Sequence, residues 1–238
     1  PELDALLAPL QMKWDEASAR YVRPGEHRNT EHTSFTVPPS LTTLPSSQRA
    51  LDPRYIALEE FEERLRITRD RKTLKVLGVV ANYAQEAALA LTRTLGIRRV
   101  SLDEALSAAI HEVMKQSEVD PEIFYAADQQ GPGGNDWPEL RRVVQQAAER
   151  VANLLFPAKE PLLIVQPGLI ARYRLEGFLQ RLLAASRDPN CAALFLLVPS
   201  RDKAGVPKIN EDLVIPEVGL PQTLWVPAEW LRHRPDAA

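Results

Sequence analysis

The chain has 238 residues, 45% of them hydrophobic and 26% charged, so it can form one large or two small domains with a buried core. This composition excludes a chain that is disordered throughout. With 29 basic and 32 acidic residues the formal net charge is −3, which removes the simple electrostatic argument for a dedicated nucleic-acid or membrane-surface binder. Contact with nucleic acid through a local basic patch stays open.

Cysteine usage and hydropathy indicate a cytoplasmic protein. The single cysteine, Cys191, cannot form an internal disulfide, so the chain needs no oxidising compartment. No apolar run approaches the roughly 18 to 20 residues of a membrane-spanning helix, and no signal-peptide pattern opens the chain. We therefore expect no membrane partner.

Three segments differ in pattern along the chain. Residues 1–21 predict an amphipathic helix, and because the chain starts inside this pattern at Pro1 we expect a fragment of a longer protein. Residues 22–55 are rich in Pro, Ser and Thr and predict an extended linker. Residues 56–235 alternate between aliphatic runs and amphipathic stretches, which predicts an α/β domain. The apolar stripe of the first segment consists of Leu3, Leu6, Leu7, Leu10 and Trp14.

The α/β region opens with a predicted helix over residues 56–70, which has a charged outer face. An aliphatic run over 73–80 predicts a strand covered on both faces, which is typical of a parallel sheet. Asn82 stands where an N-cap is expected for a helix over 83–95, and Gly96 is the expected stop.

Two further helices carry recognisable start signals. Ser101 and Glu104 fit a capping box in front of a helix over residues 102–116. Asp136 is the expected cap of a long helix that reaches about Phe156, with Pro138 in its first turn.

The most secure supersecondary unit is a strand over residues 162–165, a helix over 169–185 and a strand over 192–198. The unit implies parallel strands, so we predict a mostly parallel sheet flanked by helices, with a helical and extended N-terminal extension. Short strands over 213–215 and 224–226 are separated by prolines that suit sheet edges. We expect residues 229–238 to be a frayed tail.

The first candidate site is the turn between the strand and the helix of that unit. The carboxyl edge of a parallel sheet is where open α/β folds bind ligands, so Gln166, Gly168, Arg172 and Tyr173 could hold a phosphate or carboxylate. The segment lacks the GxxxxGK[ST] pattern that cradles nucleotide phosphates. The alternative is an ordinary βα turn with a surface arginine.

The second candidate site is a glycine-rich loop over residues 128–137. Its glycines, Gly133 among them, allow close backbone approach, and Asp128 and Asp136 could meet a cation. The pattern is not an EF-hand loop. The alternative is a structural loop anchored by a half-buried Trp137.

Other catalytic and cofactor patterns are absent from the sequence. His27 and His32 lie in the predicted linker without an HExxH pattern or a cysteine partner, and there is no GxSxG element around a nucleophile. We expect no bound metal, no cofactor and no enzymatic activity in this chain.

Aromatic and basic residues supply two weaker surface candidates. Trp14, Trp225 and Trp230 could contact a partner protein, although burial is the alternative for each of them. A run of basic residues could instead contact DNA. That run consists of Arg64, Arg66, Arg69, Arg71 and Lys72.

Several segments, taken in order, resemble the C-terminal region of large multidomain proteins of bacterial phage-defence islands, the BREX-associated PglW type. They are residues 74–79 (LKVLGV), 100–105 (VSLDEA), 127–128 with 131–133 (GPG), 136–140 (DWPEL), 161–173 (PLLIVQPGLIARY) and 194–199 (LFLLVP). In that type a protein kinase module, or in relatives an ATPase module, precedes such a tail. The kinase and Walker A signatures are absent here.

The resemblance implies a role in antiviral defence as part of a large assembly. Our leading hypothesis is therefore a non-catalytic accessory domain that docks other protein modules of a defence assembly. The alternatives are a degenerate nucleotide- or phosphate-binding domain at Gln166 to Tyr173 and a DNA-contacting module.

Overall fold

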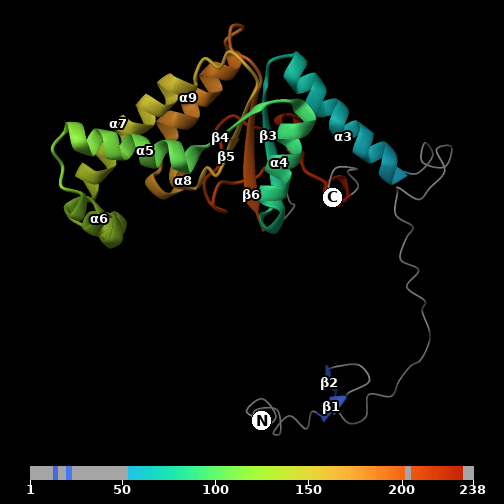
Figure 1. The fold of residues 1–238 in the computed structure, drawn as a ribbon, viewed down its shortest axis with the longest axis horizontal. Coiled ribbons are helices and arrows are strands. Elements are labelled where there is room, and N and C mark those ends of the chain that lie inside the picture. Colours follow the sequence, from blue (N-terminus) through green and yellow to red (C-terminus); the bar gives the residue numbers. More distant parts are fainter. Residues whose placement is uncertain (1–12, 16–19, 23–52, 202–204, 233–238) are drawn as a thin grey trace. The chain divides into compact units, whose positions relative to one another are not determined.

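A computed structural model describes residues 13–15, 20–22, 53–201 and 205–232 (Figure 1). The chain divides into two units, Pro1–Pro39 and Ser40–Ala238. In the first, β1 (Lys13–Asp15) pairs antiparallel with β2 (Arg20–Val22), and Trp14 stands opposite Tyr21. The helix predicted over residues 1–21 is therefore wrong for the strand residues. The other residues of that predicted helix, and most of the predicted linker over residues 22–55, lie outside the described residues.

The second unit is built on a five-stranded sheet with the order β4-β5-β6-β3-β7. Every neighbouring pair is parallel, so the predicted α/β class with a parallel sheet is confirmed. The βαβ unit is confirmed as well, because β5 and β6 are neighbours. The strands are β3 (Leu74–Val80), β4 (Arg98–Ser101), β5 (Leu162–Val165), β6 (Leu194–Ser200) and β7 (Thr223–Trp225).

Helices cover both faces of this sheet (Figure 1). Along β5, Leu162 and Ile164 enter one core while Leu163 and Val165 enter the other, as strand alternation requires. The first face carries α5 (Leu102–Gln116), α6 (Pro121–Gln130), α7 (Trp137–Leu155), α8 (Gly168–Tyr173) and α9 (Glu176–Arg187). The second carries α3 (Pro53–Asp70), α4 (Ala84–Leu95) and α10 (Ala228–Arg232). Each fully buried aliphatic side chain contributes roughly 1.5 to 3 kcal/mol.

Two helix boundaries follow their sequence signals. The Ser101 hydroxyl accepts the Glu104 N–H at 3.2 Å and so caps α5, as predicted. Gly96 ends α4 in the left-handed conformation, with φ 60° and ψ 40°.

Two other boundaries differ from the prediction. Asn82 lies inside a 3-10 turn (Ala81–Tyr83) and does not cap α4, which begins after Tyr83. The helix predicted over residues 169–185 is two helices, because Arg174 adopts a left-handed conformation with φ 53° that ends α8 before α9 begins at Glu176. With this break both Tyr173 and Leu175 are buried, whereas a continuous helix would direct them apart.

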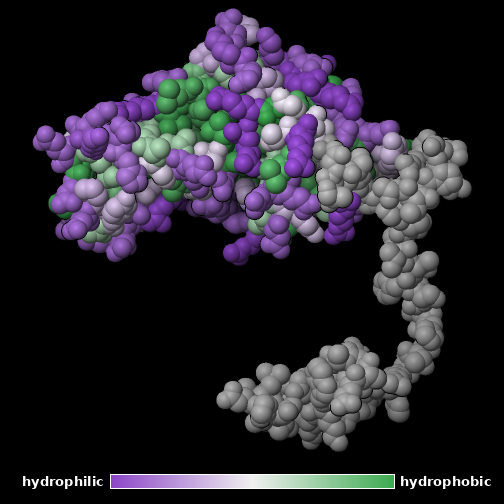
Figure 2. All heavy atoms as spheres, viewed as in Figure 1, coloured by the Kyte–Doolittle hydropathy of each residue, from purple (hydrophilic) through white to green (hydrophobic). Residues whose placement is uncertain are grey.

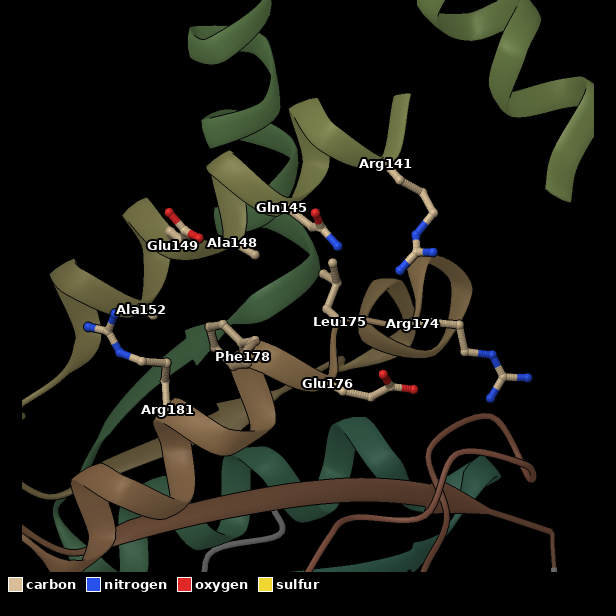
Figure 3. Close-up of a pocket in the computed structure, with 11 residues that line it drawn as sticks. Arg141, Gln145, Ala148, Glu149, Ala152, Arg174, Leu175, Glu176, Phe178 and Arg181 are labelled. Atoms are coloured by element: carbon tan, nitrogen blue, oxygen red, sulfur yellow. The ribbon is translucent and has the colours of Figure 1, made fainter. Parts of the chain in front are cut away.

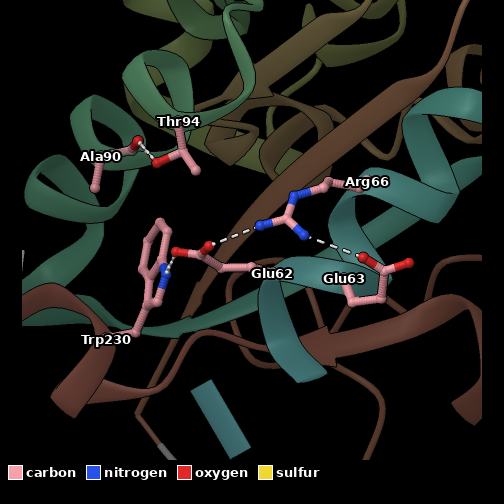
Figure 4. Close-up of polar contacts among 6 residues, drawn as sticks. All are labelled: Glu62, Glu63, Arg66, Ala90, Thr94 and Trp230. Atoms are coloured by element: carbon pink, nitrogen blue, oxygen red, sulfur yellow. Dashed lines mark hydrogen bonds and ion pairs between the residues drawn. The ribbon is translucent and has the colours of Figure 1, made fainter. Parts of the chain in front are cut away.

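The C-terminal segment is more ordered than predicted. The predicted strand over 213–215 is only an isolated bridge between Ile209 and Leu213, whereas β7 forms an edge of the sheet as expected. The tail predicted from residue 229 is wrong for α10, where Trp230 is 3% exposed. Its indole N–H donates to Glu62 Oε1 at 2.9 Å, which ties α10 to α3 (Figure 4).

Across the described ranges, no helix combines the length and hydrophobicity required to cross a bilayer.

Candidate functional site

The carboxyl edge of the sheet is where the first candidate turn lies. Gln166 follows β5 with φ 53°, a conformation that costs a non-glycine residue free energy and persists where surrounding contacts impose it. Two such contacts come from the neighbouring strand β4 and from the start of α5. The Ser101 hydroxyl donates to Gln166 Oε1 at 2.7 Å, and the Asp103 N–H donates to the Gln166 carbonyl at 3.1 Å.

Asp103 lies in the first turn of α5, and its side chain contacts the first turn of α8. Its Oδ1 accepts the Leu169 N–H at 2.8 Å, and a Cβ added to Gly168 would lie 3.1 Å from its Oδ2. Asn210 closes the turn from the other side by donating to the Gly168 carbonyl at 3.2 Å. Burial raises the pKa of the Asp103 carboxyl, and the Leu169 N–H opposes that shift. An anion arriving at this helix terminus would meet the chain's own carboxyl group.

Residues from the two predicted candidate sites are in contact in the structure. Asp128 lies in α6 rather than in a loop, and Arg172 lies in α8, 44 positions along the chain. Arg172 Nε donates to Asp128 Oδ1 at 3.1 Å and Nη2 donates to Oδ2 at 2.8 Å, which is the bidentate geometry that guanidinium groups favour. The Tyr173 hydroxyl donates to the same Oδ1 at 2.9 Å.

Tyr173 is the buried member of this group. Tyr173 is 5% exposed, and the centroid of its ring lies 5.8 Å from that of Trp137 at the start of α7. Burial first, and then the hydrogen bond to Asp128, raise the pKa of the Tyr173 hydroxyl to about 12. Asp128, Arg172 and Tyr173 therefore form an internally satisfied tie between α6 and α8.

The glycine-rich loop is short and presents little to a cation. Gly131–Gly133 forms a 3-10 turn in which Gly131 has φ 71° and Gly133 is exposed. Asp136 occupies the N-cap position of α7, as predicted, but its side chain makes no capping hydrogen bond. Asp128 is engaged with α8, so the structure does not bring the two carboxylates of this candidate together. In the part of the chain that the structure describes, no three metal-ligating side chains gather.

The candidate contact tryptophans have different environments. Trp230 is buried against α3, where its ring makes an edge contact with Phe61 at 5.0 Å. Trp225 is half-buried, donates to the Gly205 carbonyl at 3.0 Å and lies over Gly78, where an added Cβ would come within 2.6 Å of its ring. Trp14 lies in β1, and its side chain is outside the described part.

The basic run is partly neutralised by its own helix. Arg66 pairs with Glu62 and Glu63 at 3.2 and 3.1 Å (Figure 4). Arg69 pairs with Asp70 at 3.2 Å. These pairs reduce the positive field that contact with DNA would require.

Sequence analysis missed a groove between α7 and the start of α9 (Figure 3). The groove has a volume of about 450 Å³ and is lined by one face of α7 and by the segment that follows Arg174. The groove lies beside the break between α8 and α9 at Arg174. The positive φ of Arg174 has no simple sequence signal, so a pattern search would not find this groove.

These features define the chain's larger unit as an α/β domain with an all-parallel sheet, in which the chain's own side chains occupy the carboxyl ends of β4 and β5. The chain is 30% identical over 236 aligned residues to a protein named probable kinase PglW from Streptomyces coelicolor. The match covers 94% of this chain but only 14% of that protein. A comparison with known protein families finds no match, and none of the solved structures matches.

Proposed function

We propose that this chain is a non-catalytic accessory domain of a larger PglW-like protein of antiviral defence, and that it docks partner protein modules in the cytoplasm. The observation that carries the proposal is the closed carboxyl edge of the sheet. Asp103 is hydrogen-bonded to the Gln166 carbonyl and to the Leu169 N–H, and Asn210 is hydrogen-bonded to the Gly168 carbonyl. These groups occupy the position where an open α/β fold would hold a ligand.

The connection between β3 and α4 supports the same proposal. A P-loop places a glycine-rich segment between a strand and a helix, so that backbone N–H groups surround the phosphates. Here the connection is the single turn Ala81–Tyr83, which contains no glycine and leads straight into α4. Its length and residue types do not suit a phosphate cradle.

The defence context rests on similarity. The match to probable kinase PglW spans nearly the whole chain, and the ordered motifs resemble the tails of BREX-associated proteins. Because the matched region is a small part of that protein, a supporting role beside separate catalytic modules is the simplest assignment.

A binding assay with the full chain tests docking. The probes are the remaining modules of the parent protein and the proteins encoded beside it, each purified and titrated by isothermal calorimetry. We expect at least one of them to bind, and a set in which none binds overturns the proposal.

A thermal-shift assay tests the nucleotide alternative on the same chain. A nucleotide at 100 times its dissociation constant adds about 2.7 kcal/mol to the free energy of unfolding and raises the melting temperature visibly. We expect no shift with ATP, ADP, GTP or GDP, each with magnesium. A saturable shift with any of them would favour the phosphate-binding alternative.

A further inference from the structure

The groove between α7 and α9 has an apolar floor and a charged rim (Figure 3). The floor consists of Ala148, Ala152, Leu175 and Phe178, each of them buried. The rim carries three arginines and two glutamates, namely Arg141, Arg174, Arg181, Glu149 and Glu176. Figure 2 shows hydrophobic surface gathered over α7 and α9 among the polar side chains that surround it.

Arg141 has a donor that the described residues leave unused. Its Nε atom is buried and has no hydrogen-bond partner in the described part of the chain. A buried N–H without an acceptor costs about 1 to 3 kcal/mol, and more where the group is charged. Figure 3 shows its guanidinium directed into the groove, toward Leu175. An oxygen acceptor supplied by a bound molecule would remove that cost.

The other two arginines are held in place at the ends of the groove. Arg174 pairs with Asp212 at 2.7 Å, and Arg181 donates to Asn153 at 2.6 Å. A guanidinium has five N–H donors, so each retains donors for a further acceptor. No side chain caps the first turn of α9, where the carbonyls of Arg174 and Leu175 accept the N–H groups of Glu176 and Phe178.

The two glutamates affect which kind of anion the groove can bind. Glu149 and Glu176 line the groove beside the arginines, so they disfavour two negative charges concentrated on one compact group such as a phosphate, whereas carboxylates spaced along a peptide can each pair with a separate arginine. A carboxylate carries one charge and matches a guanidinium in bidentate geometry. A volume near 450 Å³ with an apolar floor also suits a few residues of peptide rather than a nucleic acid.

We infer that this groove binds a short acidic segment of a partner protein. The carboxylates of that segment pair with Arg141 and with the arginines at the two ends, and an apolar side chain between them lies on Leu175 and Phe178. The inference rests on the proposed docking function and names its site and the chemistry of its partner.

The test uses the full chain and a fluorescein-labelled octapeptide of alternating Glu and Leu, measured by fluorescence anisotropy. The isosteric octapeptide of alternating Gln and Leu is the neutral probe, and a version with phosphoserine in place of Glu is the phosphate probe. We expect the acidic probe to bind at least tenfold more tightly than either of them. We also expect its affinity to fall as sodium chloride is added, because the contacts are ionic.

Substitutions then locate the site. Arg141→Gln should weaken the acidic probe at least tenfold, and because Arg141 Nε has no bond within the described residues the fold should survive. The matched control is Arg142→Gln, whose side chain is 70% exposed and pairs with Glu139 away from the groove, and it should change affinity less than twofold. Glu149→Gln should strengthen binding two- to threefold, an effect that misfolding would not produce.

Three results would overturn the inference: no binding of the acidic probe, equal binding by the Arg141 and Arg142 variants, or preference for the neutral or phosphorylated probe. These outcomes are separable from failure of docking itself. If a partner module binds the wild-type chain and the Arg141→Gln variant equally well, docking stands and the groove is not its site.

Discussion

Replacing Asp128 with alanine should destabilise the α/β domain by about 2 to 3 kcal/mol. The ion pair with Arg172 is partly exposed, with side-chain exposures of 48% and 23%, so it contributes only about 0.2 to 1 kcal/mol. The larger cost comes from Tyr173, whose partly buried hydroxyl would lose its acceptor, at about 1 to 3 kcal/mol. Urea unfolding followed by circular dichroism measures the change.

The matched control for this substitution is Asp212→Ala. That carboxylate also pairs with an arginine, Arg174, at 2.7 Å, but both side chains are more than half exposed. We expect a loss of about 0.5 kcal/mol or less there. A double-mutant cycle between Asp128→Ala and Tyr173→Phe should give a coupling of about 1 kcal/mol or more. Equal losses for the two aspartates, or a coupling near zero, would refute the account of the tie.

Three further predictions follow from the same contacts. Because the pKa of Tyr173 is raised to about 12 in the folded chain, unfolding releases its proton between pH 10 and 12. The free energy of unfolding should therefore fall over that range by up to about 2.7 kcal/mol more than in Tyr173→Phe, as measured in a pH series of urea melts. Trp137→Ala should cost about 3 to 5 kcal/mol, whereas Asp136→Ala, which removes no capping bond, should cost under about 0.5 kcal/mol; equal values in thermal melts would contradict this. Gly78→Ala should cost about 1 to 3 kcal/mol by displacing Trp225, while Gly177→Ala, whose added Cβ meets open space in α9, should be neutral or slightly stabilising in the same assay.

Elements set by local patterns were predictable from the sequence. The aliphatic run over residues 162–165 predicted β5 with its observed bounds, because a strand buried on both faces has few other patterns. The Ser101 cap and the Gly96 stop were also predictable, since each depends on its own backbone conformation and near neighbours.

Elements set by distant contacts were not predictable in the same way. Asp136 and Asn82 are residue types that cap helices, yet neither makes the capping bond, because local preference is only a weak prior against tertiary packing. The bond from Arg172 to Asp128 joins positions 44 residues apart. Both residues were predicted as candidates from the sequence, but in two separate sites, and their contact was not predicted.

The helix break at Arg174 lies between the filled turn at the edge of the sheet and the groove. If residues 169–185 formed one helix, as periodicity predicts, Tyr173 and Leu175 would point apart and could not both be buried. Ending α8 after six residues lets its first turn rest on Asp103 and its last on Asp128. Starting α9 afresh places an uncapped helix terminus and Arg174 opposite α7. The break that lets α8 rest on the edge of the sheet also leaves Leu175 and the start of α9 lining the groove, which is why we propose recognition there rather than at the edge.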